Sequence, residues 1–202
     1  LGPYLELAEN MGSLMGQMVR QTHDITINYC GNVTNLDTRP LTHAALKGIL
    51  SAYTHNPVNY VSAPAIAKDK GIDVHEVLID GKDDFAGSIR IKFEGHKEGP
   101  DQIWGTIFGN KHPRIVRLGQ IYMDAIPEGY MIVVQNIDKP GVIGNLGTTL
   151  GKHGINIGRF QLGRREDRAL CIINIDTPAD DSVLEEIIAL PNILSAVQVH
   201  LD

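Results

Sequence analysis

The sequence has few of the features that mark secreted or membrane-embedded proteins. It contains two cysteines, Cys30 and Cys171, which lie far apart in apolar segments. We interpret them as buried free thiols in a reducing compartment, with a disulfide or a catalytic thiol as the alternatives. No apolar run approaches the roughly 20 residues of a membrane-spanning helix, and no signal peptide is apparent. These absences predict a cytoplasmic protein without a membrane partner.

The sequence also lacks a basic excess and the common catalytic and metal-binding motifs. Its 18 basic and 24 acidic residues give a net charge of −6, which excludes a chain-wide basic surface for nucleic acid. The metal-site patterns H-E-x-x-H, C-x-x-C and D-x-D-x-D-G are absent, as is the G-x-S-x-G motif of serine hydrolases. We therefore predict no catalytic residue, no metal site and no nucleic-acid partner. Any bound anion requires a local basic cluster.

The first part of the chain combines helices with a run of strands. Residues 3–20 predict an amphipathic helix, in which we assign the methionines to packing. Its apolar face is formed by Leu5, Ala8, Met11, Met15 and Met18. Alternation over residues 24–31 predicts a half-buried strand, and two further helices follow it. From 72 to 126 alternating segments predict antiparallel strands. We therefore expect an α+β domain over residues 1–126.

A second domain is expected after the Pro/Gly segment "IPEG" at 126–129. It covers residues 129–202. The predicted elements, in order, are a strand over 130–135, a helix over 140–153, strands over 155–162 and 169–176, a helix over 180–190 and a strand over 193–201. This β-α-β-β-α-β order is the ferredoxin-like arrangement.

The most distinctive segment is "NIDKPGVIGNLGTTLGKHGINI", which contains five glycines between positions 141 and 154. It follows an apolar strand, as the phosphate-binding loops of nucleotide sites do. However, its G-x-x-G-x-x-G spacing differs from the G-x-G-x-x-G dinucleotide fingerprint, and the Gly-Lys-Ser/Thr of a P-loop is missing. We therefore expect no nucleotide cofactor at this segment.

The glycines instead follow the spacing of a helix. Those at positions 141, 144, 147 and 151 lie along one helical face, although each helical glycine costs up to about 1 kcal/mol relative to alanine. For Gly144, Gly147 and Gly151 two explanations remain open: close packing onto the domain's own sheet, or the approach of a ligand or another backbone. We expect Gly141 in the first turn, where free backbone N–H groups attract anions such as carboxylates.

Three polar residues flank this helix. Asn136 and Asp138 precede it, and Asn156 begins the next strand. In a β-α-β unit these two places lie at opposite edges of one subunit's sheet, so we expect two neighbouring subunits to bring them together. The resulting cleft suits a small zwitterion, with its ammonium on Asp138 and its carboxylate on the helix N–H groups. Turn and capping chemistry is the alternative for Asn136 and Asp138.

The segment "DKPGVIGNLGTTLGKHGINIGRFQLGR" resembles the ACT domain that ends many D-3-phosphoglycerate dehydrogenases. The family pattern reads D-x-P-G-x-[IL]-G-x-[VI]-G, then L-G and [IV]-N-I, and Leu146 is the mild departure from it. The segments "PYLELAENMGSLMGQM", "VNYVSAPAIAKDKGI" and "GTIFGNKHPRIVRLGQIYMDAIPEGYMIVVQNIDKPG" are similar to the family's intervening domain, often called the allosteric substrate-binding domain. The resemblance covers essentially the whole chain. Because Leu1-Gly2-Pro3 leads straight into a helical pattern, we also expect the chain to be part of a longer protein.

The resemblance implies the regulatory half of an NAD-dependent enzyme that makes 3-phosphohydroxypyruvate, the first committed step to L-serine. NAD and the catalytic residues would then belong to the rest of the parent enzyme. L-Serine would bind between paired ACT domains of a homo-oligomer. The family's effector contacts correspond to Asn136, Asp138 and Asn156, with the N–H groups near Val142 and Ile143.

The family's intervening domain can also bind an anion such as phosphate or substrate. The segment "GNKHPRIVRLG" contains the basic residues Lys111, His112, Arg114 and Arg117, and Arg114 matches a basic family position. Ile121 and Ile126 replace other positions that are basic in some relatives, so we expect at most part of the anion site. The alternative is a solvated strand end.

Two other functions remain open. The chain could be an oligomerisation module without an effector site. It could also resemble the regulatory β subunit of an L-serine dehydratase, but two cysteines are too few for the iron–sulfur cluster of the catalytic subunit.

Overall fold

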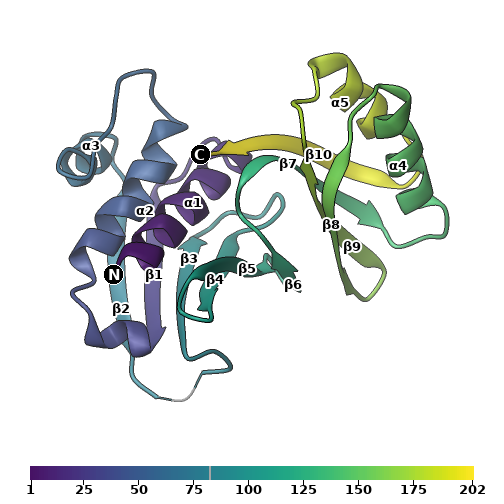
Figure 1. The fold of residues 1–202 in the computed structure, drawn as a ribbon. Helices are drawn as coiled ribbons and strands as arrows, with labels where there is room; N and C mark the ends of the chain where they lie inside the picture. The colour runs from purple at the N-terminus through teal and green to yellow at the C-terminus, as the bar shows by residue number, and fades with distance from the viewer. Residues whose placement is uncertain (82) are drawn as a thin grey trace. The chain divides into compact units, whose positions relative to one another are not determined.

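The computed structural model describes residues 1–81 and 83–202, which form two compact units, Leu1–Gln120 and Ile121–Asp202 (Figure 1). The contacts thus place the boundary six residues before the end of the first expected domain at residue 126. Among the described residues, no helix combines the length and the apolar character needed to cross a bilayer.

The first unit is an α+β domain, as expected. Its elements are α1 (Gly2–Met18), β1 (Asp24–Gly31), the 3-10 helix η1 (Asn32–Asn35), α2 (Arg39–Ser51), α3 (Ala63–Asp69), β2 (Asp73–Ile79), β3 (Gly87–Phe93), β4 (Gln102–Phe108) and β5 (His112–Leu118). Its strands are neighbours in the order β2-β1-β3-β4-β5. The pairs β1–β3, β3–β4 and β4–β5 are antiparallel. The β1–β2 pair is parallel, because α2 and α3 form a crossover between these two strands. The expected antiparallel sheet is confirmed for β1, β3, β4 and β5, and β2 adds one parallel pair at its edge.

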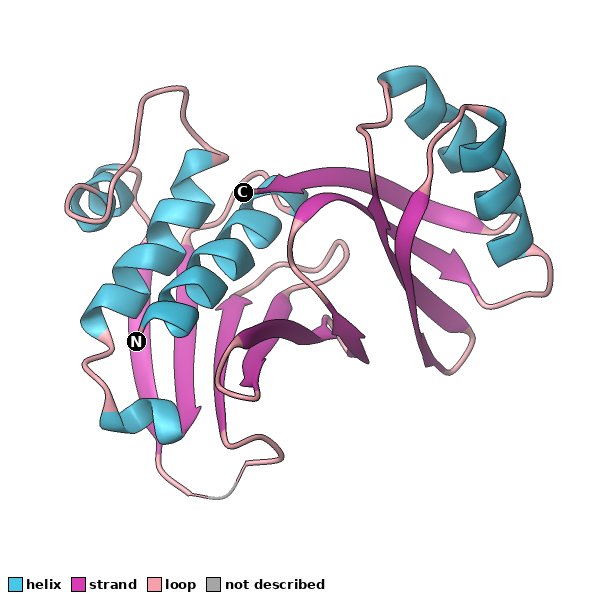
Figure 2. Ribbon diagram, viewed as in Figure 1, coloured by secondary structure: helices cyan, strands magenta, loops and turns pink. Residues whose placement is uncertain are grey.

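Helices α1 and α2 lie side by side over one face of this sheet (Figure 2). The methionine stripe is packing, as predicted, since Met11 and Met15 are fully buried. Glycine allows the two helices to approach closely. A Cβ on Gly12 would lie 2.1 Å from the carbonyl oxygen of Ala45, and one on Gly48 would lie 2.2 Å from that of Glu9. These helical glycines therefore have a packing reason.

The second unit contains the expected β-α-β-β-α-β order, preceded in the chain by one extra strand. Its elements are β6 (Ile121–Ala125), β7 (Gly129–Ile137), α4 (Val142–Lys152), β8 (Ile157–Arg165), β9 (Arg168–Ile175), α5 (Asp181–Ile188) and β10 (Ile193–Leu201). Strands β10-β7-β9-β8 form an antiparallel sheet in that order, which is the ferredoxin-like topology.

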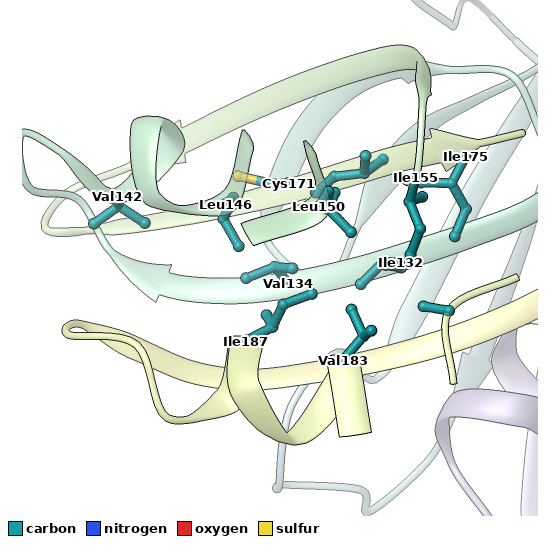
Figure 3. Close-up of a cluster of buried hydrophobic side chains, with 12 residues drawn as sticks. Ile132, Val134, Val142, Leu146, Leu150, Ile155, Cys171, Ile175, Val183 and Ile187 are labelled. Atoms are coloured by element: carbon teal, nitrogen blue, oxygen red, sulfur yellow. The ribbon is translucent and has the colours of Figure 1, made fainter. Parts of the chain in front are cut away.

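The core of this unit lies between the sheet and its two helices (Figure 3). Alternate residues of β7 and β9 point toward the helices, among them Val134 and Cys171. Leu146 and Leu150 of α4 meet them from the helix side, and both are fully buried. The sequence predicted this unit because short continuous apolar runs are typical of buried strands, and apolar residues every three to four positions are typical of a helix.

Strand β6 lies against β8, which accounts for the position of the boundary. A Cβ on Gly163 of β8 would lie 2.3 Å from Cγ2 of Ile121 and 2.8 Å from the carbonyl oxygen of Tyr122. The amide of Asn174 in β9 also donates to the carbonyl oxygens of Ile126 and Glu128. The Pro/Gly segment at 126–129 is therefore bonded to the second sheet.

Candidate functional site

The N-terminus of α4 is open to solvent and has no side-chain cap. Gly141 is the N-cap residue and not part of the first turn, and its φ of 90° lies in the left-handed region that favours glycine. The first helical residues are Val142, which is buried, and Ile143, which is exposed. Helix geometry leaves the N–H groups of a first turn without intrahelical partners. This end of α4 can therefore accept an anionic group through its backbone.

Asp138 lies next to this helix end as part of an ion pair. Its Oδ2 accepts a hydrogen bond of 2.7 Å from Nε of Arg164, and its own amide donates to the carbonyl oxygen of Asp167. The carboxylate is 23% exposed, so a small ligand can reach it. The sequence does not indicate Arg164 as a partner of Asp138, because the two residues meet only when β8 and β9 form their hairpin. A ligand ammonium would share the carboxylate with this guanidinium or displace it.

Asn136 is buried beneath this site, with 2% of its surface exposed. Its Nδ2 donates to the carbonyl oxygen of Ile137, and its Oδ1 accepts a weak hydrogen bond of 3.7 Å from Sγ of Cys171. Burial raises the pKa of the Cys171 thiol to about 11, and the negative charge of Asp138 adds to the shift. The Asn136 side chain therefore stabilises the end of β7 through bonds within the chain. Its expected contact with an effector stays a prediction.

Asn156 lies at the opposite end of the sheet from Asp138. The pairing of β9 shows this, because its Arg168 faces Ile137 and its Ile175 faces Ile157, next to Asn156. These two ends are about 23 Å apart at roughly 3.3 Å per residue. Asn156 is exposed, and its Nδ2 donates to Asp176 at 2.9 Å. A single chain therefore does not bring Asn156 and Asp138 into one cleft.

The glycine face of α4 does not pack onto its own sheet. A Cβ added to Gly144, Gly147 or Gly151 would meet no described atom within 4 Å. Of the two explanations that the sequence left open, close packing within the unit is thereby excluded for the described residues. Two exposed apolar side chains lie nearby in sequence, Ile143 on α4 and Leu162 on the edge strand β8.

The predicted basic cluster lies at the β4–β5 hairpin of the first unit. Lys111 and His112 are exposed. Arg114 donates to the carbonyl oxygen of Pro113, and its guanidinium lies 5.7 Å from the ring centre of Phe108. A β-bulge at Trp104 and Gly105 sets Arg114 opposite Thr106 and Arg117 opposite Trp104. The bulge thereby places both arginines on the same face of the sheet.

A stack of one indole ring and two guanidinium groups lies beside this cluster, and the sequence does not indicate it. Trp104 lies between two arginines on neighbouring strands, with Arg90 at 3.8 Å and Arg117 at 4.4 Å from its ring centre. Arg90 is also paired with Asp83 at 2.8 Å. Side-chain alternation in β3 and β4 places Arg90 and Trp104 in register, but the sequence does not reveal which strands are neighbours. Within residues 1–81 and 83–202 no group of acidic, histidine and cysteine side chains could hold a metal ion.

Comparison with known families agrees with this architecture. The family model for the "D-3-phosphoglycerate dehydrogenase intervening domain" matches residues 1–119, and the model for the "ACT domain" matches residues 130–192. The first match covers more than half of the chain and corresponds to the first unit. The second match covers most of the βαββαβ unit.

Curated relatives are similar over the whole length of the chain. D-3-phosphoglycerate dehydrogenase of Synechocystis is 35% identical over 205 residues, which cover 100% of this chain and 37% of the relative. The enzymes with the same name from Methanocaldococcus jannaschii and Bacillus subtilis are 33% and 30% identical, and in each case 38% of the relative is covered. The chain thus spans less than two-fifths of the length of these relatives.

The two family matches occur in the order of the two structural units. The chain therefore belongs to the family of D-3-phosphoglycerate dehydrogenase intervening domains and carries an ACT domain behind its intervening domain.

Proposed function

We propose that this chain is the regulatory region of an NAD-dependent D-3-phosphoglycerate dehydrogenase and binds L-serine between the ACT domains of two copies. The observation that carries the proposal is the placement of Asp138 and Asn156 at opposite ends of one ACT sheet. Two copies related by a twofold axis can join one end of each sheet into a shared cleft. The open glycine face of α4 leaves room for the second copy.

The chemistry of the two ends suits an α-amino acid. The Asp138 carboxylate would hold the ligand ammonium in place of Arg164, its present partner. The N–H groups of Val142 and Ile143 at the start of α4 would hold the ligand carboxylate, which would replace the long 3.5 Å bond from Val142 to the carbonyl oxygen of Lys139. Asn156 of the neighbouring copy would bind the ligand hydroxyl, since its side-chain carbonyl accepts and its amide donates.

The whole enzyme would oxidise D-3-phosphoglycerate with NAD in the part that these 202 residues do not span. The names of the relatives support this reading over that of an L-serine dehydratase subunit. The two buried free cysteines agree with a cytoplasmic location. We further propose that Lys111, His112 and Arg114 bind an anion such as phosphate. Arg114 would contribute most, since its guanidinium is held in place by the carbonyl oxygen of Pro113 and the ring of Phe108.

Calorimetry with L-serine on the whole chain tests the effector site. Asp138→Asn and Asn156→Ala should each weaken binding at least about fivefold, the scale of one charge-assisted or buried hydrogen bond. Asp37→Asn is the matched control, because this carboxylate is exposed and pairs with Arg39 in the first unit. Unchanged affinity in both site variants would move the site elsewhere.

A mixing experiment tests whether two copies share the site. If each cleft takes Asp138 from one copy and Asn156 from the other, a mixed dimer of the two variants contains one intact cleft. Random mixing should therefore restore about one quarter of the native sites at native affinity, because half of twofold dimers are mixed. No restoration would show that both residues act within one copy or in different sites.

The second candidate function is an oligomerisation module without an effector. The burial of Asn136 and its bonds within the chain favour this alternative, since one of the three expected contacts is already engaged. Sedimentation that shows self-association, together with no heat and no melting shift at millimolar L-serine, would support it over the effector site.

A further inference from the structure

The ion pair of Asp138 and Arg164 uses only one atom of each side chain. Nε of Arg164 donates to Oδ2 of Asp138 at 2.7 Å. Among the residues that the structure describes, Oδ1 of Asp138 and the two terminal guanidinium nitrogens of Arg164 have no hydrogen-bond partner. Arginine binds carboxylates most strongly through two parallel hydrogen bonds. The pair is therefore incomplete, and both side chains keep hydrogen-bonding atoms for a ligand.

Arg164 lies on the same face of the sheet as helix α4. Leu162 is opposite Cys171 of β9, which points into the core beneath the helices. Side chains two residues apart on a strand share a face, so Arg164 follows Leu162 on the helix side. Asp138 precedes Gly141, the N-cap residue of α4, by three residues. The guanidinium group is therefore held, through Asp138, near the open N-terminus of α4.

The next arginine along β8 lies on the opposite face of the sheet. Side-chain directions alternate along a strand, so Arg165 shares its face with Gly163. On that face a Cβ added to Gly163 would lie 2.3 Å from Cγ2 of Ile121 of β6. Of these two neighbouring arginines, only Arg164 is thus on the side of Asp138 and α4.

We propose that Arg164 exchanges partners when the effector binds and thereby selects ligands that carry a carboxylate. The ligand ammonium takes the place of the guanidinium on Asp138, and the released guanidinium donates to the ligand carboxylate. A carboxylate has two oxygens, so it accepts from Arg164 and from the N–H groups at the start of α4 at the same time. This inference rests on the proposed effector site and adds a selectivity to it.

A count of charge pairs shows which ligands the exchange favours. An amine without a carboxylate breaks one pair and forms one, and it leaves the Arg164 guanidinium without a partner. A carboxylic acid without an amine meets the negative charge of Asp138, which repels it. A zwitterion forms two pairs for the one that it breaks. The internal pair therefore acts against ligands that carry only one of the two charges.

The exposure of the two side chains suits this exchange. The side chain of Arg164 is 67% exposed and that of Asp138 is 23% exposed. An exposed ion pair contributes little to stability, so opening this one costs the folded chain little. The planar guanidinium matches the geometry of a carboxylate, so two parallel bonds to the ligand would be stronger than the present single bond.

Calorimetry on the whole chain with two ligands tests the exchange. Ethanolamine has the ammonium and the hydroxyl group of L-serine and lacks the carboxylate. Arg164→Gln removes the guanidinium charge and should weaken L-serine binding at least about fivefold. The same variant should bind ethanolamine about twofold more tightly or better, because Asp138 no longer has an internal partner. Displacement of L-serine at equal saturation measures ethanolamine binding, and a merely distorted site would not shift the two affinities in opposite directions.

Arg165→Gln is the matched control, since it removes the same charge from the opposite face of β8. It should leave both affinities within about twofold of the native values. Unchanged or tighter L-serine binding by Arg164→Gln would overturn the proposal, and so would an equal effect of Arg165→Gln. Ethanolamine that displaces L-serine no more readily from Arg164→Gln than from the native chain would also overturn it. A native chain that binds no L-serine would refute the effector site itself, and this inference with it, so the two failures are distinguishable.

Discussion

Gly147→Ala in α4 should stabilise the folded chain, although the same change at the helical glycines of α1 and α2 that are packed closely should destabilise it. Gly147 lies inside the helix, and a Cβ at this position would meet no described atom within 4 Å. Alanine is favoured over glycine inside a helix by about 0.5–1 kcal/mol. We therefore expect the free energy of unfolding of the second unit to rise by that amount. The melting temperature of a domain of this size should then rise by about 2–8 °C.

Urea unfolding of the whole chain, followed by circular dichroism, measures this change. Gly163→Ala is the matched control, since the same chemical change there places a Cβ 2.3 Å from Cγ2 of Ile121. Overpacking of this kind costs about 1–3 kcal/mol. The two glycine-to-alanine changes should therefore shift the stability of one unit in opposite directions. Measurements at several protein concentrations separate folding from self-association.

The same variant distinguishes folding from binding. If the glycine face receives a second copy, the added methyl group of Gly147→Ala should weaken association or L-serine binding while it stabilises each chain. A loss of stability in a dilute, dissociated sample would refute the reasoning, because it would mean that the glycine face is packed within one chain. Higher stability with unchanged association and binding would leave the glycine face without a role in pairing.

Three further predictions concern packing, the thiols and a helix cap. Gly48→Ala should destabilise the first unit by about 1–3 kcal/mol in urea unfolding, because the added Cβ would lie 2.2 Å from the carbonyl oxygen of Glu9. A neutral effect would contradict the close packing of α1 and α2. Neither Cys30 nor Cys171 should react with a thiol reagent at about pH 8 until urea unfolds the chain. Both thiols are buried, and burial raises both pKa values, that of Cys171 to about 11. Rapid labelling of the folded chain would count against this burial. Asp180 caps α5 by accepting from the amide of Val183 at 3.0 Å, and the hydroxyl of Ser182, followed by that amide, lowers the pKa of its carboxyl group. The contribution of the Asp180 charge to stability should be complete at neutral pH and be lost as the pH falls through the lowered pKa. Asp180→Ala should therefore lower the urea midpoint at neutral pH, and this difference should shrink as the pH is lowered below about 4.

The βαββαβ unit could be predicted from the sequence because its elements show their periods locally. The strands around Val134 and Cys171 are short continuous apolar runs, and α4 repeats its apolar residues every three to four. Each pattern depends on neighbours a few residues away, so no knowledge of the fold is needed to recognise it. The glycine spacing likewise argued against a nucleotide loop before any contact was known.

The boundary of the units and the pairing of the edge strand could not be predicted in this way. Ile121 belongs with the second unit because Gly163, some forty residues later, leaves space for it. Strand β2 pairs in parallel because the chain crosses over through α2 and α3. Both facts are set by contacts between distant segments, which leave no periodic signal in either segment.

The candidate site, too, could be predicted from the sequence only in part. The sequence identified Asp138 and Asn156 and implied that they lie far apart in one subunit. Only the folded chain shows that Arg164 pairs with Asp138, that Asn136 is buried, and that a bulge sets Arg114 and Arg117 on one face. It also leaves the glycine face of α4 without a packing partner among the described residues. Residue type and spacing determine what chemistry is available, whereas burial and partners are decided by tertiary packing, because they depend on which distant atoms fill the space around each side chain.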